Sequence, residues 1–190
     1  MARASLSEVH TQSWNSLHAG VTEPGHEWRT FSLATVDLNQ RPKVRTVVLR
    51  GTDQEARQLI FFTDPRTPKW QELLGRPVAE ALFWNAQEKI QLRCQCRASF
   101  HVDDDLAARY QAQVPAHLAG DYAAANMPSA PIDFPEEGQA LGTHWNFGVV
   151  VLTVEEMDWL QLRGDGHRRA GFQWRNDGEE QSWKMNWLQP

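Results

Sequence analysis

Hydrophobic and polar positions follow a helical period at the start of the chain and a period of two after it. Apolar side chains recur at helical spacing from Leu6 to Ala19, and Gly20 and Pro24 then interrupt the pattern. From Trp28 apolar and polar residues alternate, which predicts β-strands. We expect strands at 31–36, 43–50, 58–63 and 78–84, turns at 37–40 and 51–57, and a short helix at 69–74.

The segment from Ile90 to Val102 has the clearest alternation in the chain. Every second residue from Ile90 is apolar or cysteine, and the residues between them are polar. This pattern predicts a long strand with one face on the core and one polar face. Three aspartates at 103–105 then predict the start of a helix that runs to about Gln113, because acidic groups are favourable at a helix N-terminus.

The C-terminal third reads as a long loop followed by more strands. Residues 119–146 are rich in Gly and Pro and show little periodicity, which predicts a loop, and 115–118 predict a turn of helix. Strands are expected at 147–154, 157–162, 168–174 and 182–188, with a gap at Glu155 and Glu156 and a tight turn at 176–178. The chain is therefore expected to be one mainly β domain over 1–190, an antiparallel barrel or sandwich with peripheral helices. It lacks the Gly-rich loop of a Rossmann or P-loop fold.

Composition narrows the classes of partner. A net charge of −5 and a pI of about 5.8 argue against nucleic-acid binding, and no apolar run is long enough to cross a membrane. The N-terminus lacks the pattern of a secretory signal, and the two cysteines form no disulfide framework, so we expect a cytoplasmic protein. Cys94 and Cys96 lack clustered partner ligands and the seven histidines are scattered, so no metal site is expected.

Tryptophan is the unusual component. The chain has nine, and Trp183 and Trp187 fall in its last eight residues. Exposed tryptophan is unfavourable, so we expect the C-terminus to be packed or covered by a partner chain.

The segment from Thr63 to Lys69 is a candidate anion site. Thr67 suits a helix N-cap and Pro68 suits the first helical position. A lysine in the first turn opposes the helix dipole, so Lys69 makes more sense if an anion binds at that helix start. The alternative is an ordinary capped helix with a solvated lysine.

Arg45 and Arg50 enclose an apolar strand segment. A guanidinium can grip a phosphate with two hydrogen bonds. However, the odd separation sends the two side chains to opposite faces of an ideal strand, unless the strand bends near Gly51. The alternative is a pair of solvated arginines at a sheet edge.

Read in order, several segments resemble the pyridoxamine 5'-phosphate oxidase-like FMN-binding proteins. They are Leu33-Ala-Thr-Val36, Pro42-Lys-Val-Arg-Thr-Val-Val-Leu-Arg-Gly51, Phe61-Phe-Thr-Asp64 with Lys69, Gln91-Leu-Arg93, and Trp159 with Arg169. The resemblance implies an FMN-binding split β-barrel that forms a homodimer, with a flavin at each of two subunit interfaces and a small-molecule substrate.

The resemblance also implies roles for individual residues. Arg45 and Lys69 match ligands of the FMN phosphate, and Trp159 and Arg169 match contacts from the second subunit. Arg50 matches a lysine that serves both flavin and substrate, which makes Arg50 a candidate catalytic residue together with His167. The full set of implied cofactor contacts is Arg45, Thr46, Val47, Val48, Arg50, Phe62, Thr63, Lys69, Gln91, Trp159 and Arg169.

This chain departs from the family pattern mainly where the substrate is expected. Pro68 stands in the place of an arginine that precedes the phosphate-binding lysine. The family's Arg-x-His motif is represented by Asp165 and His167. Tyr110 matches a substrate-phosphate tyrosine, but the arginine that follows in the family falls near Val114 here, and no serine follows clearly. The resemblance therefore implies a retained cofactor site and an altered substrate site.

Three functions stay open at this stage. The first is an FMN-dependent oxidoreductase related to the oxidase, in which the isoalloxazine carries the redox chemistry and the protein supplies binding and orientation. The second is a flavin reductase that uses a nicotinamide or another reductant. The third is a flavin-binding module without enzymatic activity.

Overall fold

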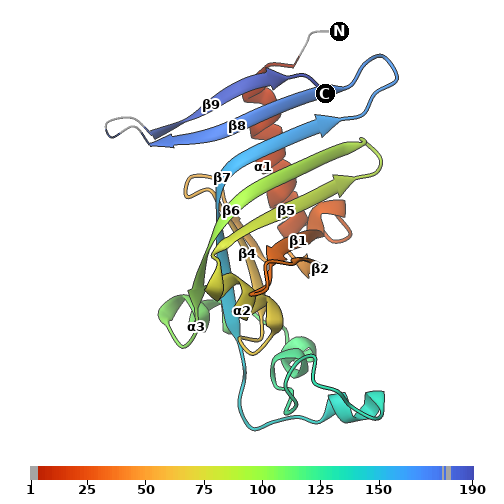
Figure 1. Ribbon diagram of the computed structural model, residues 1–190, viewed down its shortest axis with the longest axis vertical. Helices are drawn as coiled ribbons and strands as arrows, with labels where there is room; N and C mark the ends of the chain where they lie inside the picture. The colour runs from red at the N-terminus through yellow and green to blue at the C-terminus, as the bar shows by residue number, and fades with distance from the viewer. Residues whose placement is uncertain (1–3, 177, 179–180) are drawn as a thin grey trace.

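The computed structural model describes residues 4–176, 178 and 181–190, and its centre is one large antiparallel sheet (Figure 1). The strands follow the order β2-β1-β5-β6-β7-β4-β3, and β8 and β9 continue from β7. Their bounds are Thr30–Val36 (β1), Pro42–Val48 (β2), Gly51–Asp53 (β3), Gln58–Thr63 (β4), Val78–Asn85 (β5), Ile90–His101 (β6), Gly148–Gln161 (β7), Arg168–Asn176 (β8) and Gln181–Leu188 (β9). The sheet curls without closing, because β2 pairs only with β1 and β3 only with β4 among the described strands. The predicted mainly β fold is confirmed.

Helices are few and lie around the sheet. Helix α1 (Leu6–Thr22) lies behind the sheet in Figure 1, and it begins with a capping box between Ser5 and Glu8. Helix α2 (Pro68–Gly75) follows β4, and α3 (Asp105–Gln111) follows β6 with Asp104 as its N-cap. The 3₁₀ segments are η1 (Glu27–Arg29), η2 (Ala116–Tyr122) and η3 (Pro135–Gln139). Within the described ranges no helix is long and apolar enough to cross a membrane.

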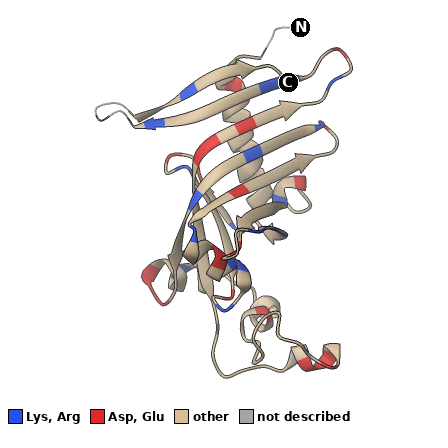
Figure 2. Ribbon diagram, in the orientation of Figure 1, with Lys and Arg blue, Asp and Glu red and all other residues tan. Residues whose placement is uncertain are grey.

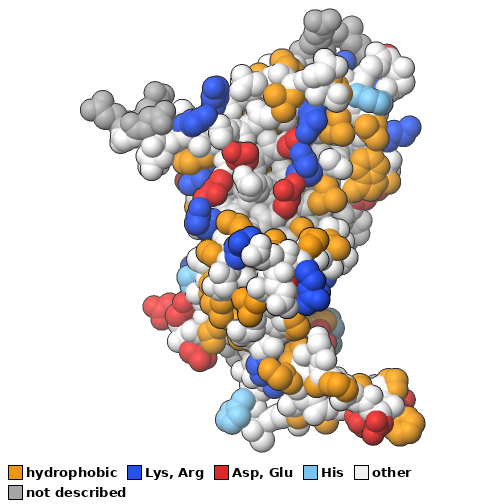
Figure 3. Space-filling view, in the orientation of Figure 1, with side chains coloured by type: hydrophobic (Ala, Val, Ile, Leu, Met, Phe, Trp, Pro, Cys, Tyr) orange, Lys and Arg blue, Asp and Glu red, His pale blue; other side chains and the backbone are white. Residues whose placement is uncertain are grey.

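The sheet has a core face and an open face. Apolar residues at alternate positions of the strands pack under α1, among them Leu33, Phe83, Leu92 and Phe172, which are fully or almost fully buried. The other face, which we name the open face, carries acidic and basic side chains in alternation along β5 to β8 (Figures 2 and 3). Residues directly opposite one another in neighbouring strands share a face, so the register assigns each side chain to one of them.

Three sequence predictions need correction. The gap predicted at Glu155 and Glu156 is part of one continuous strand, β7, because a β-bulge absorbs the extra residue between Val154 and Glu156. The turn predicted at 51–57 begins with the short strand β3, which pairs with β4. The loop predicted at 119–146 contains most of η2, all of η3 and a bridge between Ala124 and Leu141. The turn predicted at 176–178 falls partly outside the described residues.

The segment between α3 and β7 forms an arm that extends away from the sheet (Figure 1). Arg66 ties the arm to the body, because Nη2 donates to the carbonyl oxygen of Ala124 at 2.8 Å while the same guanidinium pairs with Asp64. Large apolar side chains remain exposed on the arm, including Met127, Phe134 and Leu141. Such exposure is typical of a surface that contacts another molecule.

Candidate functional site

A groove of about 700 Å³ lies between strand β2 and the start of helix α2. We name it the β2–α2 groove. Arg45 and Lys43 reach it from β2, and Thr67, Pro68 and Lys69 reach it from the helix start. Its remaining lining residues are Asp37, Leu38, Asn39, Gln71, Glu72, Pro128 and Ser129. The structure therefore brings together Arg45 and Lys69, to which the family resemblance assigns one phosphate.

Buried polar groups hold Arg45 in place. Nη2 lies 2.6 Å from Oε2 of Glu72, and Nη1 donates to the hydroxyl of Thr35 and to the carbonyl oxygen of Leu33 at 3.3 Å. Thr35 and Glu72 are both more than nine-tenths buried. Since a guanidinium has five N–H groups, two of them have no partner within the described residues and stay available to a ligand.

Lys69 has no direct ion-pair partner among the described residues. Nζ donates to Oγ1 of Thr63 at 3.0 Å, and no carboxylate oxygen of the described residues lies within 4.0 Å. Burial lowers the pKa of Lys69 and the positive charge of Arg45 lowers it further, and together they outweigh the raising effect of the Asp64 and Glu72 carboxylates. The negative charge of an anion bound between the two cations would favour the charged form of Lys69 and raise its pKa again, so the groove suits an anionic ligand.

The start of α2 adds one backbone donor to the groove. Thr67 is the N-cap and Pro68 the first helical residue, as the sequence predicts. The expected side-chain cap is absent, because Oγ1 of Thr67 donates instead to the carbonyl oxygen of Asp64 at 2.7 Å. Pro68 has no N–H group and the N–H of Trp70 donates to the carbonyl oxygen of Thr67 at 3.1 Å, so among the described residues of the first turn the backbone N–H of Lys69 stays available to an anion.

The two arginines of the β2 segment reach different places. Strand β2 ends at Val48, and Arg50 lies beyond it with its guanidinium carbon 5.8 Å from the centre of the Phe62 ring. Thr46 and Val48 lie on the open face, whereas Val47 is buried in the core. Phe62 and Thr63 end strand β4, next to the start of the segment that leads to α2. The predicted divergence of Arg45 and Arg50 agrees with this arrangement.

A second group of predicted residues lies on the open face. Gln91 of β6 is opposite Leu160 of β7, which is opposite Arg169 of β8, so Gln91 and Arg169 lie in one row across three strands. Arg169 makes a two-pronged contact with Asp158, with Nε 3.0 Å from Oδ1 and Nη2 2.6 Å from Oδ2. Arg93 donates to the same carboxylate at 2.5 Å. Burial raises the pKa of Asp158, but the hydrogen bonds from Arg169 and Arg93 outweigh it and lower the pKa below its usual value.

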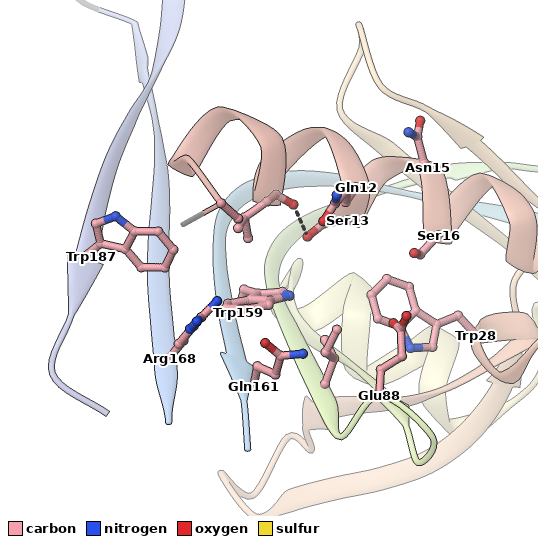
Figure 4. Close-up of a pocket in the computed structure, with 13 residues that line it drawn as sticks. Gln12, Ser13, Asn15, Ser16, Trp28, Glu88, Trp159, Gln161, Arg168 and Trp187 are labelled. Atoms are coloured by element: carbon pink, nitrogen blue, oxygen red, sulfur yellow. Dashed lines mark hydrogen bonds between the residues drawn. The ribbon is translucent and has the colours of Figure 1, made fainter. Parts of the chain in front are cut away.

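Trp159 does not join Arg169. Trp159 is opposite Leu92 and Ala170, so it lies on the core face, and 8% of its surface is exposed. Figure 4 shows it in a pocket between α1 and the sheet, together with Gln161, Arg168 and Trp187. In this chain the two residues thus face opposite sides of the sheet, and their shared contact with a flavin stays a prediction.

The candidate catalytic residue His167 lies in the exposed loop between β7 and β8. Its Nδ1 accepts a hydrogen bond from the backbone N–H of Arg163 at 3.0 Å. Asp165 pairs with the Arg163 guanidinium through two contacts of 2.7 Å. Cys94 and Cys96 are fully buried with raised pKa values, and no cluster of metal ligands occurs in the parts of the chain that the structure describes.

Sequence reasoning missed the acidic residues that position the arginines. Glu72 holds Arg45, and Asp158 holds Arg169 and Arg93. The sequence does contain a signal for Asp158: it lies between the apolar residues Met157 and Trp159, so strand alternation places its carboxylate on the polar face of β7. Glu72 gives no comparable signal, since its contact with β2 depends on how α2 packs against the sheet.

Comparisons with known proteins agree with this geometry. Residues 11–102 match the family model described as the FMN-binding domain of pyridoxamine 5'-phosphate oxidase. A pyridoxine/pyridoxamine 5'-phosphate oxidase of Deinococcus deserti is 35% identical over 128 residues, which are 64% of this chain and 54% of that protein. The same enzyme of Psychrobacter arcticus is 27% identical over 179 residues, 85% of this chain and 81% of that one. Against the relatives from Deinococcus deserti and Acaryochloris marina, the chain spans about half of their length.

Solved structures show the same fold. A pyridoxamine 5'-phosphate oxidase-related FMN-binding protein from Nostoc punctiforme is 25% identical, with a TM-score of 0.75 and full coverage of both chains. PhzG from Burkholderia lata, solved with tetrahydrophenazine-1-carboxylic acid, is 20% identical with a TM-score of 0.78, covering 100% of this chain and 98% of PhzG. Sequence matches and fold together show that residues 11–102 of this chain form an FMN-binding domain of the pyridoxamine 5'-phosphate oxidase type, and that the cofactor is FMN.

Proposed function

We propose that this chain is an FMN-dependent oxidoreductase that holds the flavin phosphate in the β2–α2 groove. The observation that carries the proposal is the half-buried ammonium of Lys69 beside Arg45, at a helix start and without a carboxylate partner among the described residues. A phosphate monoester supplies the missing negative charge and several acceptor oxygens. These donors therefore fit FMN, whose phosphate is its most strongly charged group.

The residues of the groove bind and orient the cofactor. Lys69 and the free N–H groups of Arg45 would donate to the phosphate, and Glu72 and Thr35 would keep the Arg45 guanidinium in position. Bound FMN supplies the capacity to accept a hydride or two electrons, which no side chain of this site has. Arg50 and Phe62, beyond the end of β2, would place a substrate beside the flavin.

We also propose that two chains form a homodimer through the open face. Val44 (71% exposed) and Trp84 (44% exposed) lie on this face. Exposure of such large apolar side chains to water is unfavourable, and a partner chain would cover them. Glu80, Arg93, Asp158 and Arg169 alternate in charge across it, so a two-fold axis can place opposite charges together. In such a dimer Gln91 and Arg169 would reach the flavin held by the Arg45 and Lys69 of the other chain.

Electron transfer to the bound flavin tests the enzymatic part of the proposal. FMN-loaded protein is mixed without oxygen with pyridoxamine 5'-phosphate, with a reduced nicotinamide or with buffer, and flavin absorbance is followed; the chemically reduced protein is then exposed to dioxygen. We expect the bound flavin to gain or to lose electrons faster than free FMN does in at least one arm. If no arm differs from free FMN, the chain is a flavin-binding module and the oxidoreductase proposal is wrong.

A further inference from the structure

A second cavity, of about 210 Å³, lies where η1, the end of the β2 segment and the residues after α3 meet. We name it the Arg29–Arg50 pocket. Its lining combines two guanidinium groups with a mostly apolar wall, and it includes no acidic residue: Val21, Arg29, Arg50, Phe62, Gln113, Val114, Pro115, Leu118 and Tyr122. A pocket of this composition favours a ligand with one anionic group on an apolar body.

Both cations of the pocket are free of carboxylate partners. Nη1 of Arg29 donates to the carbonyl oxygen of Val21 at 2.8 Å, and Arg50 lies over the ring of Phe62. No ion pair joins either guanidinium to an acidic side chain in the described part of the chain. Burial raises the pKa of the Tyr122 hydroxyl and the nearby Arg50 offsets part of the rise, so the hydroxyl stays protonated and able to donate.

The wall opposite these cations is apolar where the family resemblance leads one to expect phosphate ligands. The position expected to carry an arginine falls near Val114, and the neighbouring lining residues Pro115 and Leu118 are apolar as well. A phosphate monoester has three acceptor oxygens and nearly two charges. Bound here, it would turn part of that oxygen surface towards Val114, Pro115 and Leu118, which have no side-chain donor to offer.

From this juxtaposition we infer that the Arg29–Arg50 pocket binds the carboxylate of a small aromatic acid, in place of a phosphate ester. The two oxygens of a carboxylate match one guanidinium fork, and a planar ring fits against Phe62 and the apolar wall. This inference rests on the proposed function, because it assigns the substrate class of the site beside the flavin. It also explains why a positive charge is kept at Arg50 while the phosphate-binding residues expected around it are absent.

Calorimetric titration of the FMN-loaded protein tests the inference with three probes of similar shape: benzoate, phenyl phosphate and benzamide. We expect benzoate to bind at least about tenfold more tightly than phenyl phosphate, and benzamide to bind weakly or not at all. Arg50→Gln and Arg29→Gln are each expected to weaken benzoate about tenfold or more, the loss typical of a charge-assisted hydrogen bond. Arg109→Gln removes an exposed charge of α3 outside the pocket and is expected to leave benzoate binding unchanged.

Two further variants separate a loss of ligand binding from a loss of folding and test the role of the apolar wall. Arg29→Lys keeps the charge and should retain part of the benzoate affinity, with an unchanged melting temperature. Val114→Arg adds a second fork to the apolar wall and should shift preference towards phenyl phosphate. Tighter binding of phenyl phosphate by the unmodified protein, binding of no probe, or benzoate binding that Arg29→Gln and Arg50→Gln leave unchanged would each overturn the inference. FMN affinity measured on the same preparations separates these outcomes from a failure of the cofactor site.

Discussion

Nζ of Lys69 donates to Oγ1 of Thr63 over 3.0 Å and thereby ties the first turn of helix α2 to the end of strand β4. The hydroxyl of Thr63 is neutral, so this contact orients the ammonium without neutralising it. The positive charge stays directed into the β2–α2 groove beside Arg45, where the flavin phosphate is proposed to bind.

Affinity for FMN should fall at alkaline pH sooner than an exposed lysine would allow. Burial and Arg45 lower the pKa of Lys69, so in the free protein its ammonium is lost below the ordinary lysine value of 10.5. Folded apoprotein then binds fewer protons than the unfolded chain in that window, so the stability of the apoprotein rises with pH while its affinity for phosphate falls. Titrations with FMN between about pH 7 and 10 measure this. Lys69→Arg should hold its affinity to higher pH, because arginine keeps its charge there. Parallel losses in both proteins would exclude Lys69 as the cause.

Asp158→Asn should destabilise the fold by about 1–3 kcal/mol at neutral pH, because two guanidinium groups lose a shared carboxylate. The pKa of Asp158 is lowered in the folded state, so its contribution is complete above the ordinary value of 3.8 and disappears as pH falls through the folded value. Urea unfolding at equal protein concentration, at neutral pH and at roughly pH 3, measures both effects. The matched control is Glu155→Gln, which breaks the exposed pair with Arg97 and should cost less than about 1 kcal/mol. Equal losses in the two variants would count against a special role for Asp158.

Turnover of pyridoxamine 5'-phosphate or pyridoxine 5'-phosphate should be slow, below roughly 1 s⁻¹. Asp165 stands where the family resemblance implies a substrate-binding arginine, and hydrogen bonds from Arg163 lower the pKa of Asp165 to about 2, so it is negatively charged under assay conditions. The same contacts occupy Arg163, which then offers no compensating charge. Steady-state oxidase assays test this, and Asp165→Arg should raise turnover. An ordinary enzymatic rate in the unmodified protein would show that its departures from the family pattern do not disable the vitamin-phosphate site.

Subunit mixing tests the dimer. If Arg45 and Arg169 act on one flavin from different chains, Arg45→Ala and Arg169→Ala proteins should each bind FMN weakly. After mixing and subunit exchange, each heterodimer should recover one intact site, seen as flavin retained on the dimer peak by light scattering. A stable monomer with full flavin occupancy, or a mixture that regains nothing, would contradict the shared site.

Local pattern predicted the elements well, because alternation in β6 and the caps of α2 are properties of neighbouring residues. It failed at Glu155, where a bulge breaks the period without ending the strand. The cations Arg45 and Lys69 were identified in advance by family resemblance and by the unusual lysine at a helix start. Their surroundings were not, because Glu72 and Thr35 meet Arg45 only through the packing of α2 on β1 and β2. The opposite facing of Trp159 and Arg169 likewise depends on strand register, which a ten-residue spacing across a loop does not reveal.

The most direct test of the proposed cofactor site is calorimetric titration of apoprotein with FMN and with riboflavin, which lacks the phosphate, in the unmodified protein and in Lys69→Ala. We predict that FMN binds the unmodified protein far more tightly than riboflavin does, and that Lys69→Ala loses about tenfold or more in FMN affinity with no change for riboflavin. Lys89→Ala, which removes an exposed lysine from the turn between β5 and β6, serves as the control and should bind FMN normally. Equal affinities for FMN and riboflavin, or an unchanged FMN affinity in Lys69→Ala, would contradict a phosphate site in the β2–α2 groove.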